Sequence, residues 1–126
     1  MTNIRILLCD DEKVIRTGLR KMLTQAYGGC VEIAEAADGQ AGCAMYEIWR
    51  PDLVITDIRM PGMDGLETLR HMKKIAPKLP VLLLTGHASL GVAVQGMDLG
   101  AYDYMLKPVA INELIIKMEE AVRAAA

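Results

Sequence analysis

Residues 52–65 read DLVITDIRMPGMDG, and this stretch decides the fold. Its apolar part, Leu53 to Ile55, is too short for a helix and rich in β-branched residues, so it indicates a buried β-strand. The strand stops at a carboxylate, Asp57, and a loop rich in proline and glycine then leads into a helix. A buried strand that carries one carboxylate to its C-terminal end presents that carboxylate as a reactive group. We interpret the rest of the chain as the surroundings of Asp57.

The chain has 126 residues, enough for one domain with a hydrophobic core and too few for two, so we assign residues 1–126 to a single domain. Apolar residues make up 52% of it, which fits a sheet covered on both faces. The net charge of −2 argues against direct nucleic-acid binding and against a membrane-surface protein. No apolar run is long enough to cross a membrane, and residues 1–5 lack a signal-peptide core.

The three cysteines, Cys9, Cys30 and Cys43, form no CxxC motif and cannot all pair with one another. We therefore expect free thiols in a reducing compartment, which predicts a cytoplasmic protein. Small buried side chains explain these cysteines better than metal ligands or a redox site.

Short apolar runs alternate with segments of helical periodicity along the whole chain. Strands are predicted at residues 4–9, 31–36, 53–57, 81–84 and 102–106. Helices are predicted at about 12–26, after a cap at Asp38, after a cap at Asp64, at 88–99, and from 111 to near the C-terminus. This alternation predicts an α/β fold with one doubly wound parallel sheet, right-handed crossovers and helices on both faces.

Apolar residues at helical spacing predict which face of each helix is buried. In the first helix they are Val14, Ile15, Gly18, Leu19, Met22 and Leu23. In the second helix they are Ala41, Ala44, Met45, Ile48 and Trp49. In the third helix the inward residues are Leu66, Leu69 and Met72.

Polar residues stand at the ends of four of the five predicted strands. Asp10 and Asp11 follow the first strand, Asp57 ends the third, Thr85 follows the fourth and Lys107 follows the fifth. Parallel sheets bind ligands beyond the carboxyl ends of their strands, at the point where the strand order reverses. We therefore expect these five residues to share one rim of the sheet.

Three carboxylates at one rim repel each other, because two like charges about 4 Å apart cost about 4 kcal/mol at an effective dielectric of about 20. A proton on one carboxyl, or a cation between them, relieves this repulsion. A hard divalent ion such as Mg²⁺ fits, since it prefers oxygen ligands and often binds phosphate as well. With the ammonium of Lys107 and the hydroxyl of Thr85, the set suits an aspartate that attacks phosphorus, since phosphoryl transfer depends mainly on positioning and charge neutralisation.

Each of these residues alone also fits a purely structural role. An acidic pair after a strand often caps the next helix, and an aspartate such as Asp57 often lies in a turn. Lys107-Pro108 can simply end a strand. The combination is what favours a phosphoryl-transfer site, because a suitable residue type ends four of the five strands in turn.

The chain resembles the receiver domains of two-component response regulators, including the chemotaxis regulator, over essentially its whole length. The segments that carry the resemblance are LLCDDE at residues 7–12, DLVITDIRMPGMDG at 52–65, LTGHA at 84–88 and GAYDYMLKP at 100–108. The resemblance implies a flavodoxin-like fold with five helices and a five-stranded sheet in the order 2-1-3-4-5. It also implies a cis bond between Lys107 and Pro108.

The same resemblance implies roles for individual residues. Asp57 would accept a phosphoryl group from a histidine kinase or a phosphotransfer protein, and Thr85 and Lys107 would contact that group. Mg²⁺ would be held by Asp10, Asp11, Asp57 and the backbone carbonyl of Arg59. Tyr104 would turn inward as Thr85 moves, and Arg59 and His87 occupy positions that tune the lifetime of the phosphoryl group.

A phospho-acceptor switch is therefore the favoured interpretation. Such a domain catalyses only its own phosphorylation and dephosphorylation, and it is not a turnover enzyme. Phosphorylation is expected to change the surface of residues 86–106 and so to control an output partner or domain, for example in transcription regulation. A homodimer through residues 86–126 is compatible with this interpretation.

Three alternatives remain to be weighed against it. A phosphatase of the haloacid dehalogenase type would need an aspartate two residues after the nucleophile, where this chain has Arg59. A flavodoxin-like cofactor binder would need a phosphate-binding loop after the first strand, where the acidic residues 10–12 would repel phosphate. A degenerate receiver that acts as a phosphorylation-independent scaffold is less consistent with five intact site residues.

Overall fold

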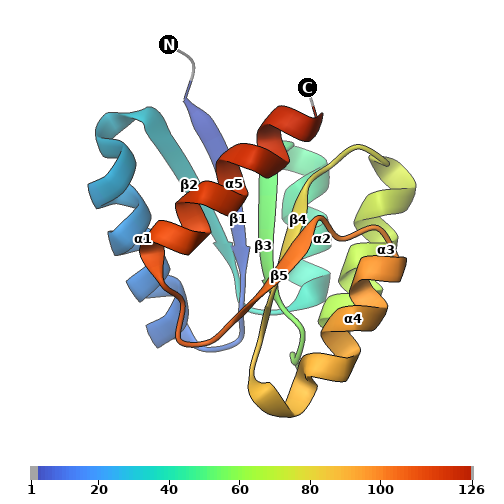
Figure 1. Ribbon diagram of the computed structural model, residues 1–126. Helices are drawn as coiled ribbons and strands as arrows, with labels where there is room; N and C mark the ends of the chain where they lie inside the picture. Colours follow the sequence, from blue (N-terminus) through green and yellow to red (C-terminus); the bar gives the residue numbers. More distant parts are fainter. Residues whose placement is uncertain (1–2, 126) are drawn as a thin grey trace.

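The computed structural model describes residues 3–125 and consists of one five-stranded parallel sheet covered by helices on both faces (Figure 1). Residues 1, 2 and 126 of the assigned domain lie outside the described part. Residues 1 and 2 are also the start of the segment 1–5 that was tested for a signal-peptide core. The elements in chain order are β1 (Ile4–Cys9), α1 (Lys13–Tyr27), η1 (Gly28–Cys30), β2 (Val31–Ala36), α2 (Gly39–Trp49), β3 (Leu53–Asp57), α3 (Gly65–Ile75), β4 (Val81–Thr85), η2 (His87–Ser89), α4 (Leu90–Asp98), β5 (Asp103–Leu106) and α5 (Ile111–Ala125).

The strand order β2-β1-β3-β4-β5 confirms the predicted topology, with the order reversing between β1 and β3. All pairs are parallel, and the register sets Cys9 opposite Thr56 and Asp57 opposite Leu84. Thr85 in turn lies opposite Leu106, so the residues that follow these positions emerge at one edge. The register therefore gathers the ends of β1, β3, β4 and β5 at a common rim.

Two hydrophobic layers hold the sheet between its helices (Figure 1). On one face, Leu7, Val54 and Leu83 pack against residues of α2, α3 and α4. On the other face, side chains one position along in each strand, such as Leu8 and Ile55, pack against α1 and α5. Successive residues of each strand point to opposite faces of the sheet, and both faces are covered by helices. The strands therefore appear in the sequence as continuous apolar runs.

The predicted buried faces of the first two helices are partly wrong. Val14 in α1 is 80% exposed and Ile48 in α2 is 83% exposed. Of the predicted stripe in α2, Met45 and Trp49 are partly buried and pack against the core, whereas Ala41, Ala44 and Ile48 are exposed. The fully buried residues of α2 are Gly39, Gly42, Cys43 and Tyr46.

Close packing explains the orientation of α2. A Cβ atom on Gly39 would collide with the side chain of Thr68 and the carbonyl of Met63, and one on Gly42 would lie 2.7 Å from the Cys9 sulfur. The helix approaches β1 and α3 so closely that glycine is required on its inner face. The inward prediction for Leu66, Leu69 and Met72 in α3 is confirmed, with Leu66 only partly buried.

The segment after β4 differs slightly from the predicted helix at 88–99. It begins as the 3₁₀ turn η2, and the α-helix α4 starts only at Leu90. Gly96 faces the sheet, where a Cβ would fall onto a methyl group of Leu83, and Gly100 ends the segment with φ at 104°. The two predicted caps are present at α2 and α3, since Asp38 accepts a hydrogen bond from the Ala41 N–H and Asp64 accepts one from the Glu67 N–H.

Candidate functional site

Asp10 and Asp57 are two buried carboxylates at the rim of the sheet. Asp57 is the last residue of β3, and Asp10 directly follows β1, the neighbouring strand. The Oδ1 atom of Asp10 accepts a hydrogen bond of 2.9 Å from the backbone N–H of Glu12, which fixes the carboxylate at the turn into α1. The parallel register thus delivers two acids to one point, as the sequence predicted.

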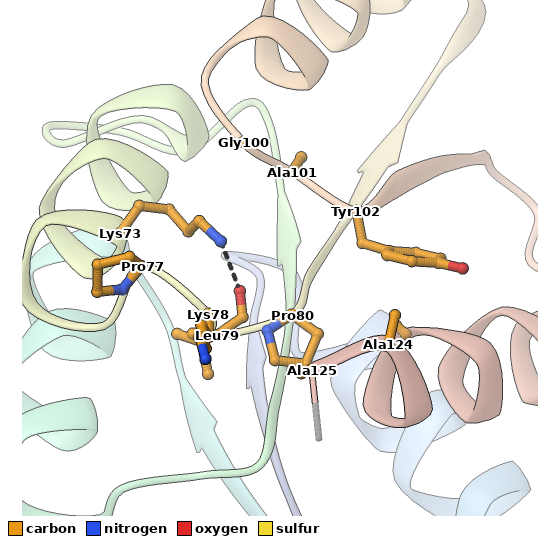
Figure 2. Close-up of a pocket in the computed structure, with 11 residues that line it drawn as sticks. Lys73, Pro77, Lys78, Leu79, Pro80, Gly100, Ala101, Tyr102, Ala124 and Ala125 are labelled. Atoms are coloured by element: carbon orange, nitrogen blue, oxygen red, sulfur yellow. Dashed lines mark hydrogen bonds between the residues drawn. The ribbon is translucent and has the colours of Figure 1, made fainter.

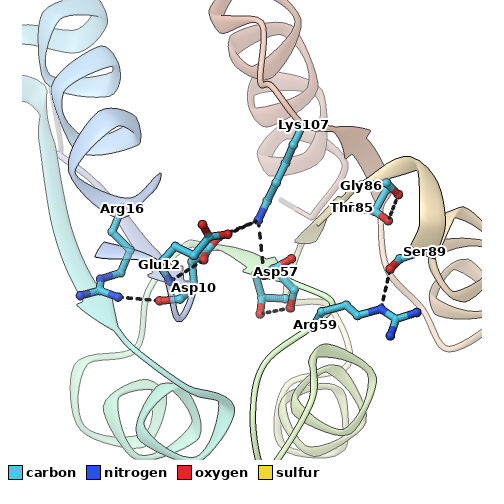
Figure 3. Close-up of polar contacts among 10 residues, drawn as sticks. Asp10, Glu12, Arg16, Asp57, Arg59, Thr85, Gly86, Ser89 and Lys107 are labelled. Carbon is cyan, nitrogen blue, oxygen red and sulfur yellow. Dashed lines mark hydrogen bonds and ion pairs between the residues drawn. The ribbon is translucent and has the colours of Figure 1, made fainter. Parts of the chain in front are cut away.

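Lys107 lies between these two carboxylates (Figure 3). Its Nζ atom is 3.1 Å from Oδ2 of Asp10 and 3.3 Å from Oδ2 of Asp57, with Oε1 of Glu12 at 3.8 Å. The lysine follows β5, and the bond to Pro108 is cis, as predicted. One ammonium group therefore neutralises charge contributed by two different strands.

The electrostatics of this cluster follow from its burial. Burial and the nearby charge of Asp10 raise the pKa of Asp57 above its ordinary value, although Lys107 and the Arg59 backbone N–H act to lower it. For Lys107, burial acts to lower the pKa, but the charges of Asp57 and Asp10 and their hydrogen bonds together raise it. The surroundings therefore favour the charged form of Lys107 and disfavour the charged form of Asp57.

The acidic residues are grouped somewhat differently from the prediction. Carboxylate oxygens of Asp10, Asp11 and Glu12 all lie within 4.8 Å of one another, while Asp57 joins them through Lys107. Asp11 and Glu12 are exposed and Asp10 is buried, so the group opens to solvent on one side. A set made of carboxylate oxygens suits a hard divalent cation such as Mg²⁺.

Thr85 lies at the rim as the last residue of β4, and Tyr104 lies within β5, opposite Leu83. Thr85 is buried at the end of β4, and its hydroxyl donates a hydrogen bond of 2.9 Å to the carbonyl of Gly86. Tyr104 in β5 is half-buried and packs against the core layer under α2, α3 and α4. The predicted roles of both residues concern a phosphorylated state.

Comparison with known proteins identifies the family. The family model described as the response regulator receiver domain matches residues 6–119. This chain is a member of that family. Response regulator MprA of Mycolicibacterium vanbaalenii is 39% identical to the receiver over 120 residues, which are 95% of this chain and 51% of that protein. The receiver thus spans about half the length of the curated relatives it matches.

Solved structures agree with the family assignment. A response regulator receiver domain protein from Clostridium thermocellum is 34% identical, with a TM-score of 0.88 over 95% of this chain and 94% of that one. The receiver domain of NtrX from Brucella abortus is 36% identical, with a TM-score of 0.86 over 94% of this chain and 98% of that one. Within residues 3–125 of this receiver, no helix is long and apolar enough to cross a membrane.

Two side-chain contacts beside the receiver site were not predicted from the sequence. Arg16, one turn into α1, donates a hydrogen bond of 2.6 Å to the carbonyl of Asp10 and pairs with Glu35 of β2 at 3.0 Å. Arg59 donates to Ser89, on the loop after β4, at 2.6 Å (Figure 3). These partners are 19 and 30 residues apart in the chain, so local spacing carries no signal of either contact.

Two hollows flank opposite ends of the receiver. One, of about 530 Å³, adjoins the site and is lined by residues that include Asp11, Arg59 and Val92. The other, of about 360 Å³, lies before β4 and β5, where Lys73 donates to the carbonyl of Leu79 at 3.0 Å (Figure 2). The described lining of this second hollow includes lysines but no acidic residue, whereas the lining of the first includes Asp11, one of the predicted metal ligands.

Proposed function

We propose that this receiver is a signalling switch in which Asp57 accepts a phosphoryl group from a histidine kinase or a phosphotransfer protein. The observation that carries the proposal is the Lys107 ammonium, held 3.1 Å from Asp10 and 3.3 Å from Asp57 at the rim. Burial and the nearby charge of Asp10 raise the pKa of Asp57, and a more basic carboxylate is a better nucleophile. Membership of the receiver family supports this assignment.

In the proposed reaction, an oxygen of Asp57 attacks the phosphorus of a phosphohistidine. The new O–P bond forms as the P–N bond breaks, and the imidazole leaves with the electron pair and keeps one ring proton. Lys107 is close enough to pair with a phosphoryl oxygen, since its ammonium already lies 3.3 Å from Asp57. The domain thereby catalyses only its own modification, and we propose no turnover substrate.

The carboxylates of Asp10, Asp11 and Asp57, with the backbone carbonyl of Arg59, are the proposed ligands of Mg²⁺. When bound, the ion supplies positive charge that neutralises the oxygens of the transferring group. The close grouping of Asp10 and Asp11 fits this role, with Glu12 as a third carboxylate that sequence analysis did not assign. The ligand set is tested by calorimetry, which compares Mg²⁺ binding by the wild type and by Asp11→Asn in the absence of any phosphoryl donor.

The proposed output is a change in the surface of residues 86–106. Thr85 would exchange its hydrogen bond with the Gly86 carbonyl for one with the phosphoryl group, and Tyr104 would turn inward behind it. We propose that this surface controls an output domain or partner, with transcription regulation as one outcome. A homodimer through residues 86–126 and a cytoplasmic location belong to the same proposal.

Intact mass after incubation with acetyl phosphate and Mg²⁺ tests the proposal. We expect the mass of one phosphoryl group to be added to the wild type, and none with Asp57→Asn or with EDTA. Asp52→Asn is a matched control, because Asp52 is an exposed aspartate that accepts a hydrogen bond from the backbone of Arg5, next to the same strand. No gain in a folded wild-type sample would favour the phosphorylation-independent scaffold instead.

A further inference from the structure

Arg59 and Ser89 join the two loops that border the site. Arg59 lies two residues after Asp57, and its Nε donates a hydrogen bond of 2.6 Å to Oγ of Ser89, which is only 5% exposed (Figure 3). The guanidinium points away from Asp57 and toward the start of α4. The loop after β3 is thereby tied to the loop after β4.

Ser89 also occupies the position before the first residue of α4, where a serine usually caps the helix. Its side chain makes no capping hydrogen bond here, and its backbone, at φ −111° and ψ 13°, lies outside the extended region that a capping residue adopts. The hydroxyl oxygen is instead engaged by Arg59. Ser89 is itself the last residue of the short 3₁₀ turn η2, and its N–H donates to the Gly86 carbonyl at 3.1 Å, which holds this conformation.

We propose that Arg59 and Ser89 form a latch that withholds the cap of α4 until Asp57 is phosphorylated. This inference rests on the proposed function and adds a mechanism to it. A phosphoryl group on Asp57 brings anionic oxygens close to Arg59, and arginine binds phosphate more strongly than it binds a neutral hydroxyl. Once Arg59 turns to the phosphoryl group, η2 unwinds, Ser89 becomes extended, and its oxygen accepts from the N–H groups of Gly91 or Val92.

The surroundings allow both positions of the guanidinium. Arg59 is exposed and lines the hollow of about 530 Å³ beside the site, which leaves its side chain room to turn. α4 is a suitable element to respond, since its first turn carries no acidic residue and Gly91 lowers its helical preference. A helix with weak local preferences depends on its cap, so the hydroxyl of Ser89 can shift the equilibrium between two states of α4.

Amide hydrogen exchange at Gly91 and Val92 tests the latch without any phosphoryl group. We expect Arg59→Ala to slow exchange at these amides about five-fold, the factor that a serine cap contributes. Loss of a contact that merely held the loop in place would speed exchange instead, and that result would overturn the proposal. Arg70→Ala, which removes an exposed arginine from α3, is the matched control and should leave exchange in α4 unchanged.

The double variant Arg59→Ala/Ser89→Ala separates capping from charge, because a cation near a helix N-terminus is itself unfavourable. We expect the double variant to lose the protection gained by Arg59→Ala. Equal protection in both would show that charge, and not the Ser89 cap, is responsible, and would overturn the proposal.

Phosphorylation with acetyl phosphate provides the second arm, with intact mass recorded on the same samples. Phosphorylated wild type should gain the same protection at Gly91 and Val92, and phosphorylated Ser89→Ala should not. Protection in phosphorylated Ser89→Ala would contradict the latch. If the mass shows no phosphoryl group in any sample, the proposed function fails, while the result of the unphosphorylated arm on the latch stands on its own.

Discussion

Replacing Lys107 with methionine removes the ammonium between Asp10 and Asp57 and leaves the two carboxylates facing each other. The two ion pairs, at 3.1 and 3.3 Å, each correspond to about 5 kcal/mol of Coulomb energy at an effective dielectric of about 20. The cost of burying the lysine offsets much of this, and breaking a buried pair typically costs about 3–5 kcal/mol. We expect Lys107→Met to lower the free energy of unfolding by about 3–5 kcal/mol at neutral pH, measured by urea unfolding.

Lys117 provides a close control. Its ammonium lies 3.1 Å from Asp103 and 3.4 Å from Glu113, so the geometry resembles that of Lys107. The carboxylate side chains around Lys117 are 34% and 53% exposed, whereas those of Asp10 and Asp57 are 2% and 8% exposed. Lys117→Met should therefore cost only about 1 kcal/mol, because solvent screens exposed pairs.

The effect of Lys107→Met should also depend on pH and on metal. Since the pKa of Asp57 is already raised by burial and by Asp10, losing the ammonium raises it further, and a proton can then replace the missing charge. The deficit should shrink between neutral pH and about pH 5, and Mg²⁺ should reduce it at neutral pH. Equal losses for the Lys107 and Lys117 variants, or a loss independent of pH, would refute the reasoning.

The remaining predictions concern charge, packing and thiol access. Because the pKa of Asp57 is raised in the folded protein, the folded protein binds a proton at Asp57 more tightly than the unfolded protein does. The free energy of unfolding therefore falls as pH rises from the unfolded-state pKa of Asp57 through its folded-state pKa. Asp57→Asn should raise the free energy of unfolding at neutral pH but not in acid. In α4, Gly96→Ala should cost about 1–3 kcal/mol by urea unfolding because it overpacks the sheet contact, whereas Gly91→Ala, with open space around it, should stabilise by up to about 1 kcal/mol. Iodoacetamide with mass detection should label the partly exposed Cys30 in folded protein, whereas Cys9, whose thiol pKa burial raises to about 12, should react only on unfolding.

The sheet and its rim could be predicted because both depend on local sequence. Continuous apolar runs fix the strands, and the parallel register then brings residues such as Asp10, Asp57 and Lys107 to one edge without further information. Strand order came from resemblance to the receiver family, since apolar runs alone do not say which strands are neighbours.

The orientation of α2 could not be predicted in this way. Nearly every residue of this helix is apolar or small, so periodicity does not single out one face, and hydrophobicity favoured Ile48 over glycine. The buried face is decided by how closely α2 approaches Cys9 and Thr68, which leaves room only for Gly39 and Gly42. This is a property of the assembled layers and not of the helix itself.

Contacts between loops were also beyond the sequence. The hydrogen bond from Arg59 to Ser89 depends on the path of two loops and on one rotamer of a long side chain. Thr85 was expected at the rim and lies there, but its hydroxyl is turned to the Gly86 carbonyl. Sequence predicted which residues gather at the site, while the state of their hydrogen bonds required the structure.

The central claim is that the phosphoryl group is carried by Asp57 itself. Borohydride reduction of the phosphorylated protein tests this most directly, because it converts an aspartyl phosphate to homoserine and leaves a stable mark in the chain. Peptide mapping by mass spectrometry should find homoserine at position 57 and unmodified aspartate at positions 10 and 11. Homoserine at either of those positions, or none in a sample whose intact mass shows phosphorylation, would contradict the account.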